Sequence, residues 1–156
     1  MVLSPKRWLS EGYSDKSDEK MFMQVYCRLP SGKATTLKVL IDTGCEVNLV
    51  REGVLPREEF GLANRRLNLT TANSQPMRGG DKIISTKLIF TRNMADLGKG
   101  DFGIDTDFYE ADINVDAILG CPWTKRNRLG IFPYLDALSL ERGGVNWTSS
   151  KTVPPS

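Results

Sequence analysis

Short apolar runs separated by polar turns recur along the whole chain. Residues 21–29 fall into two alternating sets of side chains, which is the period of a β-strand. The turn-forming residues Pro30 to Lys33 follow, and a second strand is predicted from Thr35 to Ile41. The pattern therefore predicts that the folded part of the chain begins with a hairpin.

The later apolar runs are equally short. Strands are predicted at residues 47–50, 67–71, 83–90, 104–109 and 114–119, and a closing hairpin at residues 129–132 and 137–140. The polar stretch Ala72–Asp81 lies between two of these strands, so we expect residues 67–71 and 83–90 to flank a long hairpin arm.

Helical segments are predicted to be brief. Residues 51–60 are interrupted by Gly53 and Pro56, which leaves room only for a short helix. Pro122 is a suitable first residue of another short helix, which would extend to about Asn127. Many short strands with a single brief helix near the C-terminal part predict a small, closed all-β domain.

The two ends of the chain differ in composition from the middle. Residues 1–20 are rich in charge and poor in apolar positions, which predicts a flexible arm. Residues 142–156 contain a glycine pair and a proline pair, and they are expected to be a flexible tail. The folded domain is then residues 21–141. A chain of 156 residues with 40% hydrophobic content supports one such domain with a modest core.

The charge and the cysteine content limit which binding partners and which cellular location are expected. The 21 basic and 19 acidic residues give a formal charge of +2, so no global field favours nucleic acid or an anionic membrane. No apolar run is long enough for a membrane span or a signal peptide. The cysteines, Cys27, Cys45 and Cys121, are odd in number and widely spaced, which indicates a reducing, intracellular and cytoplasmic setting.

Histidine is absent, and this limits the chemistry. Ser-His and Cys-His mechanisms are excluded, and the commonest metal ligand is missing, so neither a metal nor a cofactor is expected. The tripeptide Asp101-Phe102-Gly103 resembles a kinase signature but lacks the accompanying motifs, and we interpret it as a loop. Any catalysis must therefore rest on carboxylates.

Asp42-Thr43-Gly44 is the most informative motif. It directly follows the apolar run 39–41, so a carboxylate stands at the end of a predicted buried strand. Because Asp, Thr and Gly are also common turn formers, the tripeptide alone is ambiguous. A second signal lies downstream, where the apolar run 115–119 ends at Gly120 and is followed by Cys121-Pro122-Trp123.

The order of these motifs resembles that of the retropepsin-like aspartic proteases, most closely the protease domains of gypsy-like LTR retrotransposons. The resemblance covers about residues 21–141 and implies a closed, barrel-like retropepsin fold, a flap from about Thr70 to Gly80, and a wall at residues 109–113 that faces it. It implies that the catalytic residues are Asp42, Thr43 and Gly44. The substrate-binding residues that it implies are Cys45, Thr71, Ala72, Asn73, Ser74, Ala111, Asp112 and Ile113.

Peptide hydrolysis by carboxylates needs two of them that share one proton. The chain has a single Asp-Thr-Gly, and Asp105-Thr106-Asp107 lacks the glycine that would let the backbone approach closely. A homodimer in which each copy supplies Asp42 resolves this, and the resemblance implies the same arrangement. The resulting hypothesis is an aspartic endopeptidase that processes its own polyprotein, with peptide or polyprotein as substrate and retroelement particles as one location.

Several alternatives stay open. The chain could be a catalytically silent binding or dimerisation module, or a capsid-polyprotein fragment that recruits RNA, although the near-neutral charge and the absence of a zinc knuckle disfavour RNA. Ala72–Gly80 could be a simple surface turn and Ile113 a core residue. Glu110 and Asp112 could face the cleft and favour basic substrate residues, or face solvent.

Three further places in the sequence also need interpretation. Cys45 stands where the family usually carries Ala or Ser, and it is either a small buried hydrophobe or an oxidisable thiol. Cys121-Pro122 replaces the Met-Asp that many relatives carry before Trp123, which is expected to pack in the core. The basic residues Lys125, Arg126 and Arg128 are interpreted as a solvated helix face, and a contact with phosphate or nucleic acid is the alternative.

Overall fold

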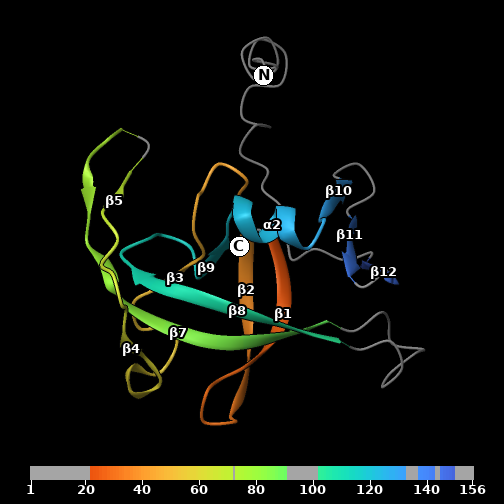
Figure 1. Ribbon diagram of the computed structural model, residues 1–156, viewed down its shortest axis with the longest axis horizontal. Coiled ribbons are helices and arrows are strands. Elements are labelled where there is room, and N and C mark those ends of the chain that lie inside the picture. Colours follow the sequence, from red (N-terminus) through yellow and green to blue (C-terminus); the bar gives the residue numbers. More distant parts are fainter. Residues whose placement is uncertain (1–21, 72, 91–101, 133–136, 143–144, 150–156) are drawn as a thin grey trace.

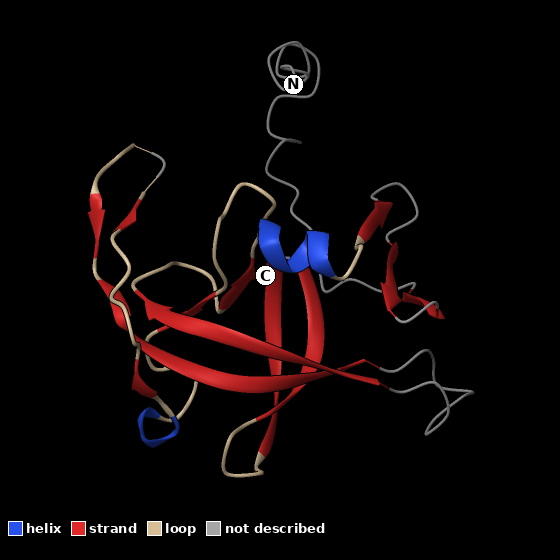
Figure 2. Cartoon of the chain, viewed as in Figure 1, coloured by secondary structure: helices blue, strands red, loops and turns tan. Residues whose placement is uncertain are grey.

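A closed β-barrel forms the body of the protein (Figures 1 and 2). The computed structural model describes residues 22–71, 73–90, 102–132, 137–142 and 145–149. Its main sheet has seven strands in the order β1-β2-β9-β3-β8-β7-β4, and β1 also pairs with β7, so that six strands close into a ring with β4 outside it. The strands of this sheet are β1 (Phe22–Arg28), β2 (Ala34–Ile41), β3 (Leu49–Arg51), β4 (Gly61–Leu62), β7 (Gly79–Phe90), β8 (Phe102–Ala111) and β9 (Ala117–Leu119).

Smaller elements surround the barrel. The only α-helix among the described residues is α2 (Cys121–Arg126), and a 3-10 helix, η2, covers Arg57–Glu59. The remaining strands are β5 (Leu69–Thr70) and β6 (Pro76–Met77), which pair with each other, and β10 (Gly130–Phe132), β11 (Ala137–Arg142) and β12 (Val145–Ser149), which form a three-stranded sheet. This architecture confirms the predicted fold class, a small closed all-β barrel with one short helix.

The first hairpin forms as the alternation predicted. β1 pairs antiparallel with β2 over its whole length, from Phe22 opposite Leu40 to Arg28 opposite Ala34. Alternate residues of β1 are buried and exposed from Met23 onward, because successive side chains of a strand point to opposite faces. The turn closes at Gly32, whose φ of 96° suits glycine.

Strand β9 brings two distant parts of the chain to the same end of the barrel. It lies between β2 and β3, parallel to β2 and antiparallel to β3. Because β2 and β9 run in the same direction, the segment that follows Ile41 and the segment that follows Leu119 leave the sheet side by side. Asp42-Thr43-Gly44 and Gly120 therefore lie close together although they are far apart in the sequence.

Apolar side chains gather on both faces of this part of the sheet. One buried cluster fills the barrel and includes Val39, Leu119 and Trp123. A second, smaller cluster lies on the other face, with Leu40 and Ile118 among its buried members. The alternation of side chains along β2 and β9 explains the division between the two clusters.

Helix α2 covers the barrel through Trp123. The helix begins one residue before the predicted start, with Pro122 in its first turn. Trp123 is buried, its indole Nε1 donates a hydrogen bond to Oγ1 of Thr106 at 3.0 Å, and its ring lies 6.1 Å from that of Phe90. Leu140 of β11 belongs to the same cluster, so the expected core role of Trp123 is confirmed.

The hairpin arm was predicted with the wrong partner strand. Residues 83–90 were expected to pair with residues 67–71, but they belong to β7, which pairs with β8 and β1. The return strand of the arm is β6, because the chain turns tightly between Thr71 and Gln75. Gly79 and Gly80, both at positive φ, then begin β7 through an irregular register with β8.

Two other boundaries also differ from expectation. Phe102 and Gly103 were interpreted as part of a loop, but they open strand β8 opposite Phe90 and Ile89. Strand β12 lies beyond residue 141, within the predicted tail, and pairs with β11. The predicted N-terminal arm, residues 1–20, and Asp101 lie outside the described residues. In the described part of the chain, no helix has both the length and the apolar character needed to cross a membrane.

Candidate functional site

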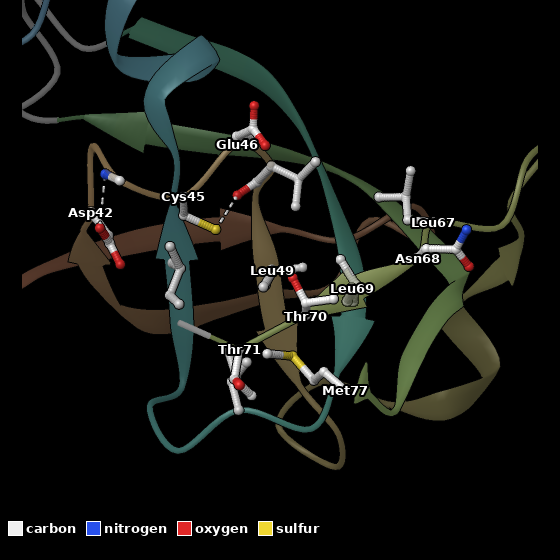
Figure 3. Close-up of a pocket in the computed structure, with 14 residues that line it drawn as sticks. Asp42, Cys45, Glu46, Leu49, Leu67, Asn68, Leu69, Thr70, Thr71 and Met77 are labelled. Atoms are coloured by element: carbon white, nitrogen blue, oxygen red, sulfur yellow. Dashed lines mark hydrogen bonds between the residues drawn. The ribbon is translucent and has the colours of Figure 1, made fainter. Parts of the chain in front are cut away.

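The Asp42 loop, residues 42–48, is held at the end of β2 by backbone hydrogen bonds. The amide of Asp42 donates to the carbonyl of Leu119 at 3.1 Å, and the amide of Cys45 donates to the carbonyl of Asp42 at 3.1 Å. The amide of Gly44 donates to Oδ1 of Asp42 at 3.0 Å, which is the local bond that aspartate makes in turns. The half-buried carboxylate therefore has one oxygen fixed by the backbone of its own loop (Figure 3).

The segment after β9 holds this loop through two further hydrogen bonds. The amide of Gly120 donates to Oδ1 of Asn48 at 2.9 Å, and the amide of Cys121 donates to the carbonyl of Cys45 at 2.7 Å. A Cβ on Gly120 would stand 2.5 Å from the carbonyl oxygen of Val47 and 2.6 Å from that of Cys45. Only glycine permits this close approach. Gly120 of the downstream motif therefore helps to hold the loop that carries Asp42.

A cavity of about 700 Å³ opens between the Asp42 loop and the arm, which we define as β5, β6 and the described turn residues between them. Figure 3 shows the fourteen residues that line it. They are Asp42, Gly44, Cys45, Glu46, Val47, Leu49, Leu67, Asn68, Leu69, Thr70, Thr71, Met77, Ile113 and Ile118. Its wall combines apolar side chains with polar groups, among them the carboxylate of Asp42, which suits a ligand that has both apolar side chains and polar groups.

Five of the predicted site residues line this cavity, and they come from three separate segments. They are Asp42, Gly44, Cys45, Thr71 and Ile113. The structure thus brings the predicted acid, one residue of the predicted flap and one residue of the facing wall to a single place.

The other predicted site residues that the structure describes do not line the cavity. Thr43 is exposed beside it, and Asn73 and Ser74 are exposed at the turn of the arm. Ala111 is fully buried in β8. Asp112 is exposed, and its carboxylate lies 4.0 Å from the guanidinium of Arg78. Ala72 lies outside the described residues.

Negative charge reaches the cavity from a residue that the sequence analysis did not select. Glu110 and Asp112 were considered as acidic groups near the cleft, but neither lines the cavity. Glu46 does line the cavity. It follows the turn at Asp42 to Cys45, where the chain runs along the cavity before β3 begins. No sequence signal marked Glu46, since the direction of a loop side chain depends on the loop conformation.

The apolar walls were also missed, although the alternation of strands could have found part of them. Leu49 and Ile118 are paired across β3 and β9, and Leu69 and Met77 are paired across the arm. Ile118 lies between two residues of the barrel core, so alternation predicts that its side chain faces the other side of the sheet.

Cys45 is a half-buried thiol in the cavity wall. Its Sγ donates to the carbonyl of Val47 at 3.2 Å. Burial raises the pKa of the Cys45 thiol, and the negative charges of Asp42 and Glu46 raise it further, against the lowering effect of hydrogen bonds with the backbone. The thiol form is therefore favoured at neutral pH, which disfavours Cys45 as a nucleophile.

A second acidic loop is not found near Asp42 in the described residues. Asp105 and Asp107 lie in β8, outside the residues that line the cavity, and Asp105 is 3.8 Å from Nζ of Lys87. Within the described ranges, no group of three or more His, Cys, Asp or Glu residues could hold a metal ion. One chain therefore presents one Asp-Thr-Gly loop to the cavity.

Comparison with known proteins finds a similarity in structure but no match among family models or curated proteins. Among solved structures, the chain is similar to the retroviral protease-like domain of Ddi1 from Leishmania major, with 16% sequence identity and a TM-score of 0.48. The alignment covers 85% of this chain and 94% of that chain.

Proposed function

We propose that the protein is a retropepsin-like aspartic endopeptidase that acts as a homodimer. The observation that carries the proposal is the position of Asp42, a half-buried carboxylate on the wall of a cavity of about 700 Å³ that has both apolar and polar surface. Its loop is fixed by bonds to the segment after β9, so the acid is held in one orientation, as catalysis requires.

Two copies are needed because one chain presents one carboxylate of this kind. Across a two-fold axis, Asp42 of one copy meets Asp42 of the other, and two carboxylates about 3 Å apart retain one shared proton. The ionised carboxylate takes a proton from a water molecule, and the protonated carboxyl donates to the carbonyl oxygen of the scissile bond. Thr43 is exposed beside Asp42 and is therefore free to contact the second copy.

The substrate is proposed to be an extended peptide between the Asp42 loop and the arm. Extended peptides bind through main-chain hydrogen bonds, and their alternate side chains enter pockets. Thr70 and Thr71 of the arm and Ile113 after β8 line the cavity opposite the loop, so they would contact such a peptide. Processing of a retroelement polyprotein, in the cytoplasm or within retroelement particles, is the biological task that we propose.

A peptide-cleavage assay tests the proposal. The protein is incubated with a peptide library at pH ~4–6, where a shared-proton pair works best, with and without a pepstatin-type inhibitor. We expect cleavage that the inhibitor blocks, and we expect the Asp42→Asn variant to lose about 10²–10⁴-fold in rate. Cleavage by that variant at the wild-type rate contradicts the assignment. A folded wild-type dimer without any cleavage would instead favour the silent binding module.

A further inference from the structure

The cavity contains a second carboxylate whose charge is not balanced by its surroundings. Figure 3 shows Glu46 on the same loop as Asp42 and Cys45. The side chain is exposed, and none of the fourteen residues that line the cavity is Lys or Arg. Glu46 therefore gives one margin of the cavity a negative charge.

Three acidic residues at the opposite end of β3 and β9 have basic partners. Arg78 lies 3.1 Å from Glu52 and 4.0 Å from Asp112, and Arg51 lies 2.8 Å from Asp116. Within the described part of the chain, no ion pair includes Glu46. Its charge is thus available to a ligand, whereas Glu52, Asp112 and Asp116 are already paired.

Glu46 follows Cys45 directly along the loop, and both residues line the cavity. Its negative charge acts together with that of Asp42 on the thiol of Cys45, which lies in the cavity wall. Val47 and Leu67 provide apolar surface in the same cavity. A long basic side chain can place its methylene groups on such surface and keep its charged end at a carboxylate.

We propose that Glu46 selects peptides that carry Lys or Arg close to an apolar side chain bound in the cavity. The apolar side chain contacts the wall formed by Leu49, Met77 and Ile118, and the basic side chain extends to the margin at Glu46. This inference deepens the proposed endopeptidase function and rests on it. An exposed ion pair is weak, so the expected preference is about two- to fivefold, and added salt reduces it.

Paired peptides test this selection. Sequences cleaved by the wild-type protein are resynthesised with Lys or Gln at each position that flanks the scissile bond, and kcat/KM is measured for both members of each pair. At one position or more, the wild-type protein should prefer Lys by about two- to fivefold at low salt. The ratio should fall to about one in Glu46→Gln and below one in Glu46→Lys.

A matched control separates a local effect from a change in total charge. Glu58, on η2, is exposed and does not line the cavity, so Glu58→Gln should keep the wild-type ratio. Light scattering on each variant shows whether the oligomeric state has changed. A Glu46→Gln variant that keeps the Lys preference, or that loses activity only because it no longer assembles, overturns the inference.

The same peptides distinguish this inference from the proposed function. Cleavage of both members at equal rates at every position overturns the role of Glu46 and leaves the protease intact. If no peptide is cleaved, apolar peptides with Lys or Gln at scanned positions are tested for binding by fluorescence anisotropy. A Lys preference in binding that is lost in Glu46→Gln then supports the charge selection and contradicts the protease. Absence of both binding and cleavage overturns both proposals.

Discussion

The two sides of the cavity are held in different ways. The Asp42 loop is bonded to segments that are distant in sequence, through Leu119, Gly120 and Cys121. The hydrogen bonds of the described arm residues 69–77 stay within the arm, and the apolar side chains of Leu69 and Met77 pack against the second core cluster. Figure 1 shows the arm as a projection from the barrel, whereas the loop lies at its end.

This difference suggests that the loop positions a side chain, whereas the arm can adjust to what it covers. A catalytic acid must be held in one orientation. The loop that carries the proposed acid, Asp42, is held by several hydrogen bonds to the barrel. A segment that covers a peptide has to admit different side chains, and a projecting hairpin with few bonds to the barrel can move as a unit. We therefore expect substitutions that disturb the loop to cost more stability than substitutions in the arm.

Substitution of Gly120 by alanine should have the largest effect. The new Cβ would stand 2.5 Å and 2.6 Å from two backbone oxygens of the Asp42 loop, which cannot move without breaking its bonds. We expect a loss of about 3 kcal/mol in the free energy of unfolding, measured in urea, together with loss of peptide cleavage. Gly61→Ala is the control, because no atom lies within 4 Å of a Cβ built there. Equal stability of the two variants would contradict the bracing of the loop.

Removal of the Asn48 side chain should have an intermediate effect. In Asn48→Ala, the buried amide of Gly120 loses its acceptor, and the carbonyl of Asp107 loses a donor. We expect a cost of about 1–2 kcal/mol, measured by the same unfolding experiment. Asn64→Ala, at an exposed position outside the cavity, should change stability by less than about 0.5 kcal/mol. A loss in Asn48→Ala no larger than in this control would argue against the bond.

Thr71→Val should have the smallest effect on stability. Oγ1 of Thr71 accepts hydrogen bonds from the amides of Asn73 at 3.3 Å and Gln75 at 3.2 Å, and the residue is exposed. We expect a change within about 0.5 kcal/mol in the free energy of unfolding, but faster hydrogen exchange in the arm. Thr70→Val is the control, at the neighbouring exposed position. A loss comparable to that of Asn48→Ala would show that the arm is as firmly tied as the loop.

The local sequence pattern predicted where the strands lie better than it predicted which strands pair with each other. The alternation in residues 21–29 and 35–41 predicted the first hairpin because the two strands are separated only by a tight turn. The partner of residues 83–90 was missed because β7 pairs with β8 and β1, and nothing in a local pattern specifies a pairing across the barrel. Gly79 and Gly80, both at positive φ, mark the irregular start of that strand.

The candidate site was predictable where a motif fixed the backbone. The positions of Asp42 and Gly120 could be predicted because each follows the end of an apolar strand, and a glycine allows the close backbone approach found there. Glu46 and Leu67 could not be predicted in this way, since both lie outside the strands and their side-chain directions depend on how those segments pack in three dimensions. Asp112 was expected at the cavity, but Arg78, which is distant in sequence, lies beside its carboxylate instead.

Mixing wild-type protein with the Asp42→Asn variant tests the central proposal most directly. The two chains are unfolded together and refolded at increasing proportions of the variant, with the amount of wild-type chain held constant, and peptide cleavage is measured. If the active unit needs Asp42 from two copies, activity per wild-type chain should fall in proportion to the wild-type fraction, because mixed dimers contain one acid. Activity per wild-type chain that stays constant at every proportion would contradict a shared site and with it the proposed mechanism.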